Sequence, residues 1–138
     1  MVALAFFATA INYLDRQTLS VVAPVLMDQF HMSNVAYGRV LSAFMLAYTV
    51  GNGICGSVLD RIGTRLGFAL TMAWWSTAAM LHALTRGTWS LGVHRFLLGI
   101  GEAGNWPAGV KVVTEWFPTE ERALASGIFN RAWRPAHI

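Results

Sequence analysis

The sequence predicts an all-α protein that crosses a membrane several times. Of its 138 residues, 55% are hydrophobic and only 12% are charged, and the mean hydropathy is +0.47. Soluble domains average about 25% charged residues, so this share is too small to cover a soluble surface. The apolar segments are longer than the roughly 9–11-residue strands of an outer-membrane barrel and do not alternate with period two. Helices are therefore the expected membrane-crossing elements.

Polar connectors divide the apolar sequence into segments of the length that a bilayer requires, about 20 residues. We expect helices at about 2–27, 40–59, 66–84 and 89–116, and the start of a fifth helix at 123–130. Pro107 is expected to kink the fourth helix, because proline removes a backbone hydrogen bond. Residues 131–138 form an atypical polar tail that a proline interrupts.

The composition argues against several other classes of protein. The net charge is +3, but the ten basic residues are scattered, so we expect no nucleic-acid binding. The single cysteine, Cys55, excludes an internal disulfide and a cysteine-based zinc site, and the histidines lack ligand spacing, so no metal is expected. A Gly-x-Gly-x-x-Gly pattern at 51–56 lies inside an apolar segment, which favours helix packing over dinucleotide binding. We expect no cofactor and no enzymatic activity.

The short turn after the second segment indicates an orientation. It carries Arg61 and Arg65 against one acid, Asp60. Basic residues concentrate in cytoplasmic loops. We therefore expect this turn, and with it the N-terminus, on the cytoplasmic side.

Four ionisable residues lie at apparent membrane depth: Asp15, Arg16, Arg95 and Glu102. An ionisable residue at the bilayer centre costs about 2.5–3.5 kcal/mol on insertion scales, and such residues usually mark a substrate or proton pathway. The alternative is that these four pair only to hold the helices together. Two acids beside two arginines favour the pathway.

The fourth helix is expected to have two different faces. At about 100° per residue, Arg95 and Glu102 lie within roughly 20° of one another, and Trp106 falls on the same face. Small residues that permit close helix packing occupy the opposite face: Gly101, Gly104 and Ala108. Tyr13 and Tyr48 lie in the first and second helices. A tyrosine in a span more often packs than binds, but beside two arginines its hydroxyl is a candidate partner for a polar ligand.

Four stretches resemble known transporters. The pattern Gly56-x-x-x-Asp60-Arg61-x-Gly63-x-Arg65 resembles the signature between helices two and three of the major facilitator superfamily. A narrower resemblance is to the anion:cation symporter family, in particular its bacterial hexuronate, glucarate and galactonate transporters. It is carried by the stretches 12–16, 95–107 and 115–130, and the tail after residue 130 departs from it.

The resemblance implies a fold of twelve helices in about three times this length. The chain would supply the first four transmembrane helices and the start of a fifth, as a partial N-terminal transmembrane domain at 1–138. The missing C-terminal half would be its partner in the cavity. The gating motif would comprise Gly56, Asp60, Arg61, Gly63 and Arg65.

The resemblance also implies residue roles. Arg16 and Arg95 would hold a sugar-acid carboxylate, while Tyr13 and Tyr48 would bond its hydroxyl groups. The proton-coupling acids would be Asp15 and Glu102.

The sequence thus predicts a fragment of a secondary active transporter in the inner membrane. Its partners would be a sugar-acid anion, a proton and the lipid bilayer. Two alternatives remain open at this point. One is a small four-helix membrane exporter, which typically uses a lone carboxylate, and the other is an inert structural membrane fragment.

Overall fold

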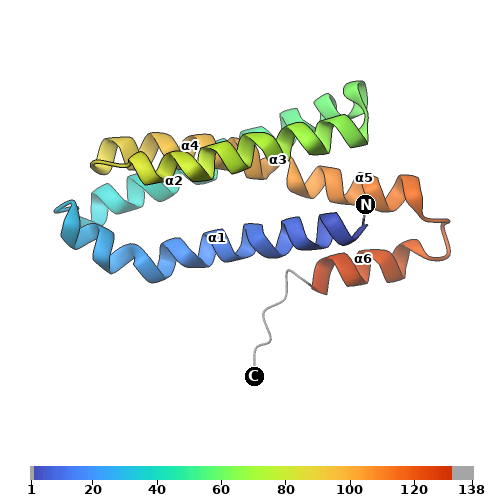
Figure 1. Cartoon of the computed structure of the whole chain (residues 1–138), viewed down its shortest axis with the longest axis horizontal. Helices are drawn as coiled ribbons and strands as arrows, with labels where there is room; N and C mark the ends of the chain where they lie inside the picture. Colours follow the sequence, from blue (N-terminus) through green and yellow to red (C-terminus); the bar gives the residue numbers. More distant parts are fainter. Residues whose placement is uncertain (1, 132–138) are drawn as a thin grey trace.

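Helices make up all the regular structure in residues 2–131, which are the residues that the computed structural model describes (Figure 1). The expected tail at 131–138 lies outside them apart from its first residue. In chain order the elements are α1 (Val2–Gln29), α2 (Asn34–Ile62), α3 (Thr64–Leu81), the 3-10 turn η1 (His82–Leu84), α4 (Thr88–Ala103), α5 (Asn105–Trp116) and α6 (Arg122–Arg131). The predicted all-α fold class is confirmed.

The second helix is longer than the expected 40–59, because both of its ends are capped. At its start the Ser33 hydroxyl accepts a hydrogen bond from the Ala36 amide at 3.1 Å, which satisfies one free donor of the first turn. At its end Gly63 adopts a φ of +86°, and its amide donates to the Leu59 carbonyl at 3.1 Å. This backbone conformation favours glycine, so Gly63 fixes the reversal into α3.

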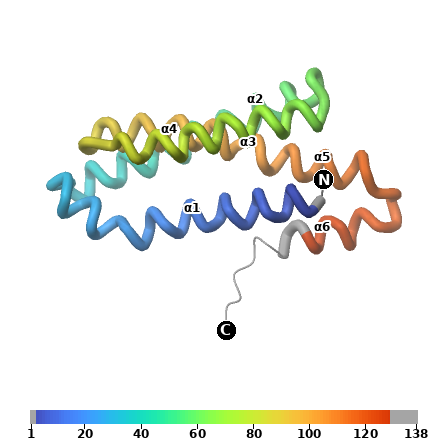
Figure 2. Tube along the Cα trace, in the orientation of Figure 1, coloured from blue at the N-terminus to red at the C-terminus, as the bar shows by residue number. Residues whose placement is uncertain are grey.

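The single fourth helix expected at 89–116 is two helices in the structure. α4 ends at Ala103 and α5 begins at Asn105, with Gly104 between them. Pro107 has no amide hydrogen to donate to the carbonyl four residues earlier, so the regular bonding is interrupted at Ala103. Figure 2 shows the chain passing from α4 into α5 at this point. The kink that was expected at Pro107 is thus a break between two helices, and it lies next to the buried charges.

Close approach of backbones packs α4 between α2 and α3. A Cβ atom added at Gly99 would lie 2.7 Å from the Phe44 carbonyl oxygen of α2. A Cβ atom added at Gly101 would lie 2.7 Å from Trp74 of α3. Because both distances are too short for a real side chain, glycine sets the spacing of these three helices. The small-residue face expected on the fourth helix is therefore a packing face.

The outer surface of the bundle is apolar. Large side chains that are more than half exposed occur on several helices and include Phe7, Val21, Met80, Trp89 and Leu124. In the described part of the chain, α2 is the one helix whose length and mean hydropathy of 1.3 are sufficient for a membrane span. The break at Gly104 leaves α4 and α5 with only 16 and 12 residues.

We predict that Gly99→Ala destabilises the protein by about 1–3 kcal/mol, because the added methyl group would press on the Phe44 carbonyl of α2. The measurement is thermal unfolding of the protein purified in detergent. Gly53→Ala is the matched control, since nothing lies within 4 Å of its added Cβ atom and alanine favours a helix. Equal melting temperatures for the two variants would refute the packing role of Gly99.

Candidate functional site

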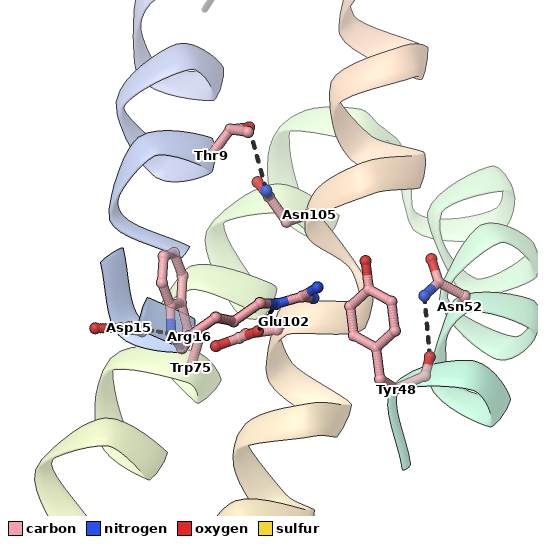
Figure 3. Close-up of polar contacts among 8 residues, drawn as sticks. All are labelled: Thr9, Asp15, Arg16, Tyr48, Asn52, Trp75, Glu102 and Asn105. Carbon is pink, nitrogen blue, oxygen red and sulfur yellow. Dashed lines mark hydrogen bonds and ion pairs between the residues drawn. The ribbon is translucent and has the colours of Figure 1, made fainter. Parts of the chain in front are cut away.

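An ion pair between α1 and α4 lies at the centre of the bundle. The Arg16 Nε atom is 3.1 Å from the Glu102 Oε2 atom (Figure 3). Glu102 is only 1% exposed, so its carboxylate lies in the interior. The pair is incompletely satisfied, because Arg16 Nη2 and Glu102 Oε1 are both buried without a hydrogen-bond partner. These free positions could bind a polar ligand.

Two aromatic rings of α2 cover the Arg16 guanidinium. Its carbon lies 4.4 Å from the centre of the Tyr48 ring and 5.5 Å from that of Phe44. The two rings are stacked on each other, with their centres 6.1 Å apart. A planar guanidinium is attracted to aromatic faces, so the rings fix its position. The structure thus brings together the predicted site residues Arg16, Tyr48 and Glu102, and adds Phe44, which the sequence analysis missed.

Asp15 and Arg16 are neighbours in α1 but contact different helices. The Asp15 Oδ2 atom accepts a hydrogen bond from the Trp75 indole of α3 at 3.0 Å (Figure 3). Trp75 was not expected in the site, because a tryptophan in an apolar segment gives no signal of its polar role. The carboxylate is therefore joined to α3, whereas Arg16 is joined to α4.

A second buried arginine stands apart from this cluster. Arg95 is 8% exposed and makes no hydrogen bond or ion pair with any residue that the structure describes, and its Nε atom is buried. It lines a chamber of about 330 Å³ between α1, η1 and α4, which we call the Arg95 chamber. Other lining residues include Thr18, Gln29, His82 and Thr85. No contact joins Arg95 to Arg16, so the two predicted carboxylate ligands occupy different positions along the bundle.

Two further residues that were expected near the site are less buried than Arg95 and Glu102. The Tyr13 hydroxyl accepts a hydrogen bond from Gln17 at 2.9 Å, one turn along the same helix. Trp106 is 43% exposed, although it was expected on the same face as the buried Arg95 and Glu102. That expectation treated 89–116 as one continuous helix, whereas Trp106 lies in α5, beyond Gly104.

A buried polar contact, also unexpected, joins α1 to the start of α5. The Asn105 side-chain amide donates to the Thr9 hydroxyl at 3.2 Å (Figure 3), and both residues are buried. The Asn12 amide nitrogen nearby in α1 is buried without a partner. The seam between these two helices is therefore polar.

The turn between α2 and α3 is held by a lysine that the sequence analysis missed. The Lys111 Nζ atom of α5 lies 2.7 Å from the Asp60 Oδ1 atom and donates to the Leu59 carbonyl at 3.0 Å. A cation at a helix C-terminus also interacts favourably with the helix dipole. Lys111 is the chain's only lysine and lies in an expected apolar span, which was an available signal.

The other residues of the expected gating motif surround this contact. Arg61 is exposed in the last turn of α2, and the Arg65 guanidinium lies 5.3 Å from the centre of the Trp116 ring. Gly56 lines a groove of about 560 Å³ between α2 and α5, together with Lys111. The motif therefore joins the α2–α3 turn to the middle and to the C-terminal end of α5.

A helical bundle with an apolar exterior and charged residues buried in its interior is typical of a membrane transport protein. The sequence model of the Major Facilitator Superfamily matches residues 5–134. The chain belongs to this superfamily, whose named relatives are transporters and not enzymes. This membership replaces the alternative of a small four-helix exporter.

Several relatives have names that describe sugar-acid transport. The hexuronate transporter of Escherichia coli (strain K12) is 40% identical over 131 residues, which cover 94% of this chain and 30% of the relative. The galacturonate transporter of Dickeya chrysanthemi is 36% identical over 94% of this chain and 38% of its own length. A probable galactarate/D-glucarate transporter of Bacillus subtilis (strain 168) is 38% identical over 96% of this chain and 30% of its own length.

A solved structure confirms the arrangement of the helices. A bacterial homologue of the human lysosomal transporter Spinster, in an inward-facing and occupied conformation, superposes with a TM-score of 0.88 at 25% identity. The match covers 95% of this chain and 28% of that chain. The chain thus spans about a third of the length of the relatives that it matches.

We predict that Arg16→Ala destabilises the protein by about 3–5 kcal/mol, because it leaves the buried Glu102 carboxylate without its cation. Adding Glu102→Gln should recover part of this loss. Unfolding of the purified protein measures both effects. The control is Arg61→Ala at an exposed position, which should change stability by no more than about 0.5 kcal/mol. An Arg16→Ala effect no larger than that of the control would contradict a structural role for the ion pair.

Proposed function

We propose that this chain is the N-terminal part of a secondary active transporter that carries a sugar-acid anion together with a proton across the inner membrane. Arg95 is the observation that carries this proposal, since it is a buried cation that makes no hydrogen bond or close ion pair with any described residue. An unpaired buried charge is costly, and an anionic ligand would compensate it. We use "full-length carrier" below for the transporter that contains this segment.

The names of the relatives support the substrate class. Hexuronate, galacturonate and galactarate are all sugar acids, and each presents a carboxylate and several hydroxyl groups. A guanidinium keeps its charge and presents a planar set of donors that matches a carboxylate. Arg95 and Arg16 are the proposed carboxylate ligands, and Tyr48, whose ring lies against the Arg16 guanidinium, is the proposed hydroxyl ligand. Tyr13 is proposed as a second hydroxyl ligand.

Proton coupling is proposed for the two acids of the site. An anion that binds to Arg16 competes with Glu102 for the guanidinium. A carboxylate that loses its cation in a poorly solvated site favours its neutral form, so anion binding and proton binding would occur together. Asp15, bonded to Trp75, is proposed as the second coupling acid.

We propose a cytoplasmic N-terminus and a cytoplasmic gate at the α2–α3 turn. Figure 1 places the N-terminus and this turn at the same end of the bundle, where Arg61 and Arg65 are exposed. That charge distribution supports the orientation. Movement of one group of helices against another would then expose the site alternately, and Asp60 with Lys111 would hold one of the two arrangements.

We predict that Arg95→Ala abolishes binding of galacturonate to the full-length carrier, because the buried cation is removed. Glu102→Gln should behave differently. It mimics the protonated acid and frees Arg16, so binding should survive while proton-driven accumulation weakens. Calorimetry on the purified variants and uptake into vesicles after a pH jump measure the two properties.

Exposed residues of the same types provide the controls for this pair. Arg86→Ala and Glu115→Gln should leave binding and accumulation unchanged. If the Glu102→Gln carrier accumulates galacturonate as strongly as the wild type in response to a proton gradient, Glu102 is not a coupling acid. Wild-type affinity in the Arg95→Ala carrier would reject the proposed role of Arg95.

We predict that Asp60→Asn slows galacturonate transport by the full-length carrier while equilibrium binding stays nearly intact. The substitution removes the charge that Lys111 contacts at the end of α2, far from Arg16 and Arg95. Lys111→Ala should have the same effect. Exchange rates in vesicles and calorimetric affinities measure the two properties, with Asp28→Asn as the exposed control. A large loss of affinity with unchanged exchange would contradict the gating role.

A further inference from the structure

Besides the Arg95 guanidinium, the Arg95 chamber contains a second buried nitrogen atom that makes no hydrogen bond to any described residue. His82, in the 3-10 turn after α3, lines the chamber together with Arg95. Its Nε2 atom is buried and has no hydrogen-bond partner among the described residues. None of the residues that line the chamber is an acid. A volume of about 330 Å³ falls within the range of small-molecule sites.

The other ring nitrogen of His82 fixes its tautomer. The Nδ1 atom lies 2.8 Å from the Ala78 carbonyl oxygen. Because a carbonyl oxygen only accepts hydrogen bonds, Nδ1 must carry the hydrogen. In the neutral ring the Nε2 atom therefore has a lone pair and cannot donate to an anion. It becomes a donor only when His82 takes up a second proton.

The charges around His82 favour this second proton when an anion occupies the chamber. The charged and titratable groups that face the ring are His94 and Arg95 from α4 and Asp15 from α1. His94 lies 5.7 Å away between ring centres, and its own Nδ1 is 3.0 Å from the Thr85 hydroxyl. Asp15 is already bonded to Trp75. Without a ligand, a charged His82 would lie beside Arg95 with no anion in the chamber, and a bound carboxylate would offset both positive charges.

We propose that the Arg95 chamber binds one carboxylate group of the substrate together with one proton, which is carried on His82 Nε2. The carboxylate accepts hydrogen bonds from the Arg95 guanidinium and from the new Nε2–H group, and the proton comes from the adjacent solution. The Arg95 Nε and His82 Nε2 atoms are both buried in this conformation, so side chains lining the chamber rotate to admit the ligand. This inference rests on the proposed function and adds to it a proton acceptor distinct from Asp15 and Glu102.

The test is calorimetric titration of the purified full-length carrier with galacturonate in buffers of different ionisation enthalpy, which counts the protons taken up per bound anion. His82→Gln places a neutral amide near the position of Nε2. His82→Asn keeps a donor for the Ala78 carbonyl and removes the chamber-facing atom. In both variants we expect up to one proton fewer per anion. We also expect affinity to fall about tenfold under acidic conditions, the value of a hydrogen bond to a charged group.

The control is His31→Gln, at an exposed histidine in the α1–α2 connector, which should match the wild type. A folded His82 variant with the wild-type proton count and pH dependence would overturn the inference while leaving the proposed function intact. Absence of galacturonate binding in the wild type would instead overturn the proposed function, and with it this inference. If neither variant folds, the Glu102→Gln carrier decides, because anion binding to it without any proton uptake would exclude His82 as an acceptor.

Discussion

The ion pair between Arg16 and Glu102 holds the first helix against the rest of the bundle. α1 has its closest backbone packing with α5 and α6, and only sparse close packing with α2, α3 and α4. Its attachment to those three helices depends on side chains: Arg16 with Glu102 and the α2 rings, Asp15 with Trp75, and an apolar cluster at its C-terminal end that includes Leu26 and Met27. Buried polar contacts are strong when complete and costly when broken, so the position of α1 depends on the charge state of a few groups.

The packing of α4 is of the opposite kind. Glycine contacts bring its backbone against α2 on one side and α3 on the other, without any titratable group. These three helices therefore form a layer whose geometry does not depend on pH or ligand. Because Glu102 and Arg95 both project from α4, two of the four charged groups of the site are held by this firmly packed element. The ligand-sensitive contacts are all on the α1 side.

The sequence was sufficient for the fold class and for the identity of the buried charges. Composition and segment length predicted a helical membrane protein, and the intramembrane positions of Arg16, Arg95 and Glu102 marked the interior. What the sequence could not provide was the partner of each group. Periodicity assigns a residue to a face of a helix, but it does not say which helix lies opposite, so the aromatic cover of Arg16 and the Asp15–Trp75 bond were not predictable.

The sparse packing of α1 against the layer of α2, α3 and α4 has a mechanical consequence. A helix held mainly by side chains can tilt through rotamer changes, whereas a helix locked by glycine contacts cannot move without separating backbones. α1 would then shift against the layer, while α5 stays held to it by the Lys111–Asp60 ion pair and by packing on α2 and α3. An applied force or a change in bilayer thickness would be absorbed at the α1 seam, which also borders the Arg95 chamber.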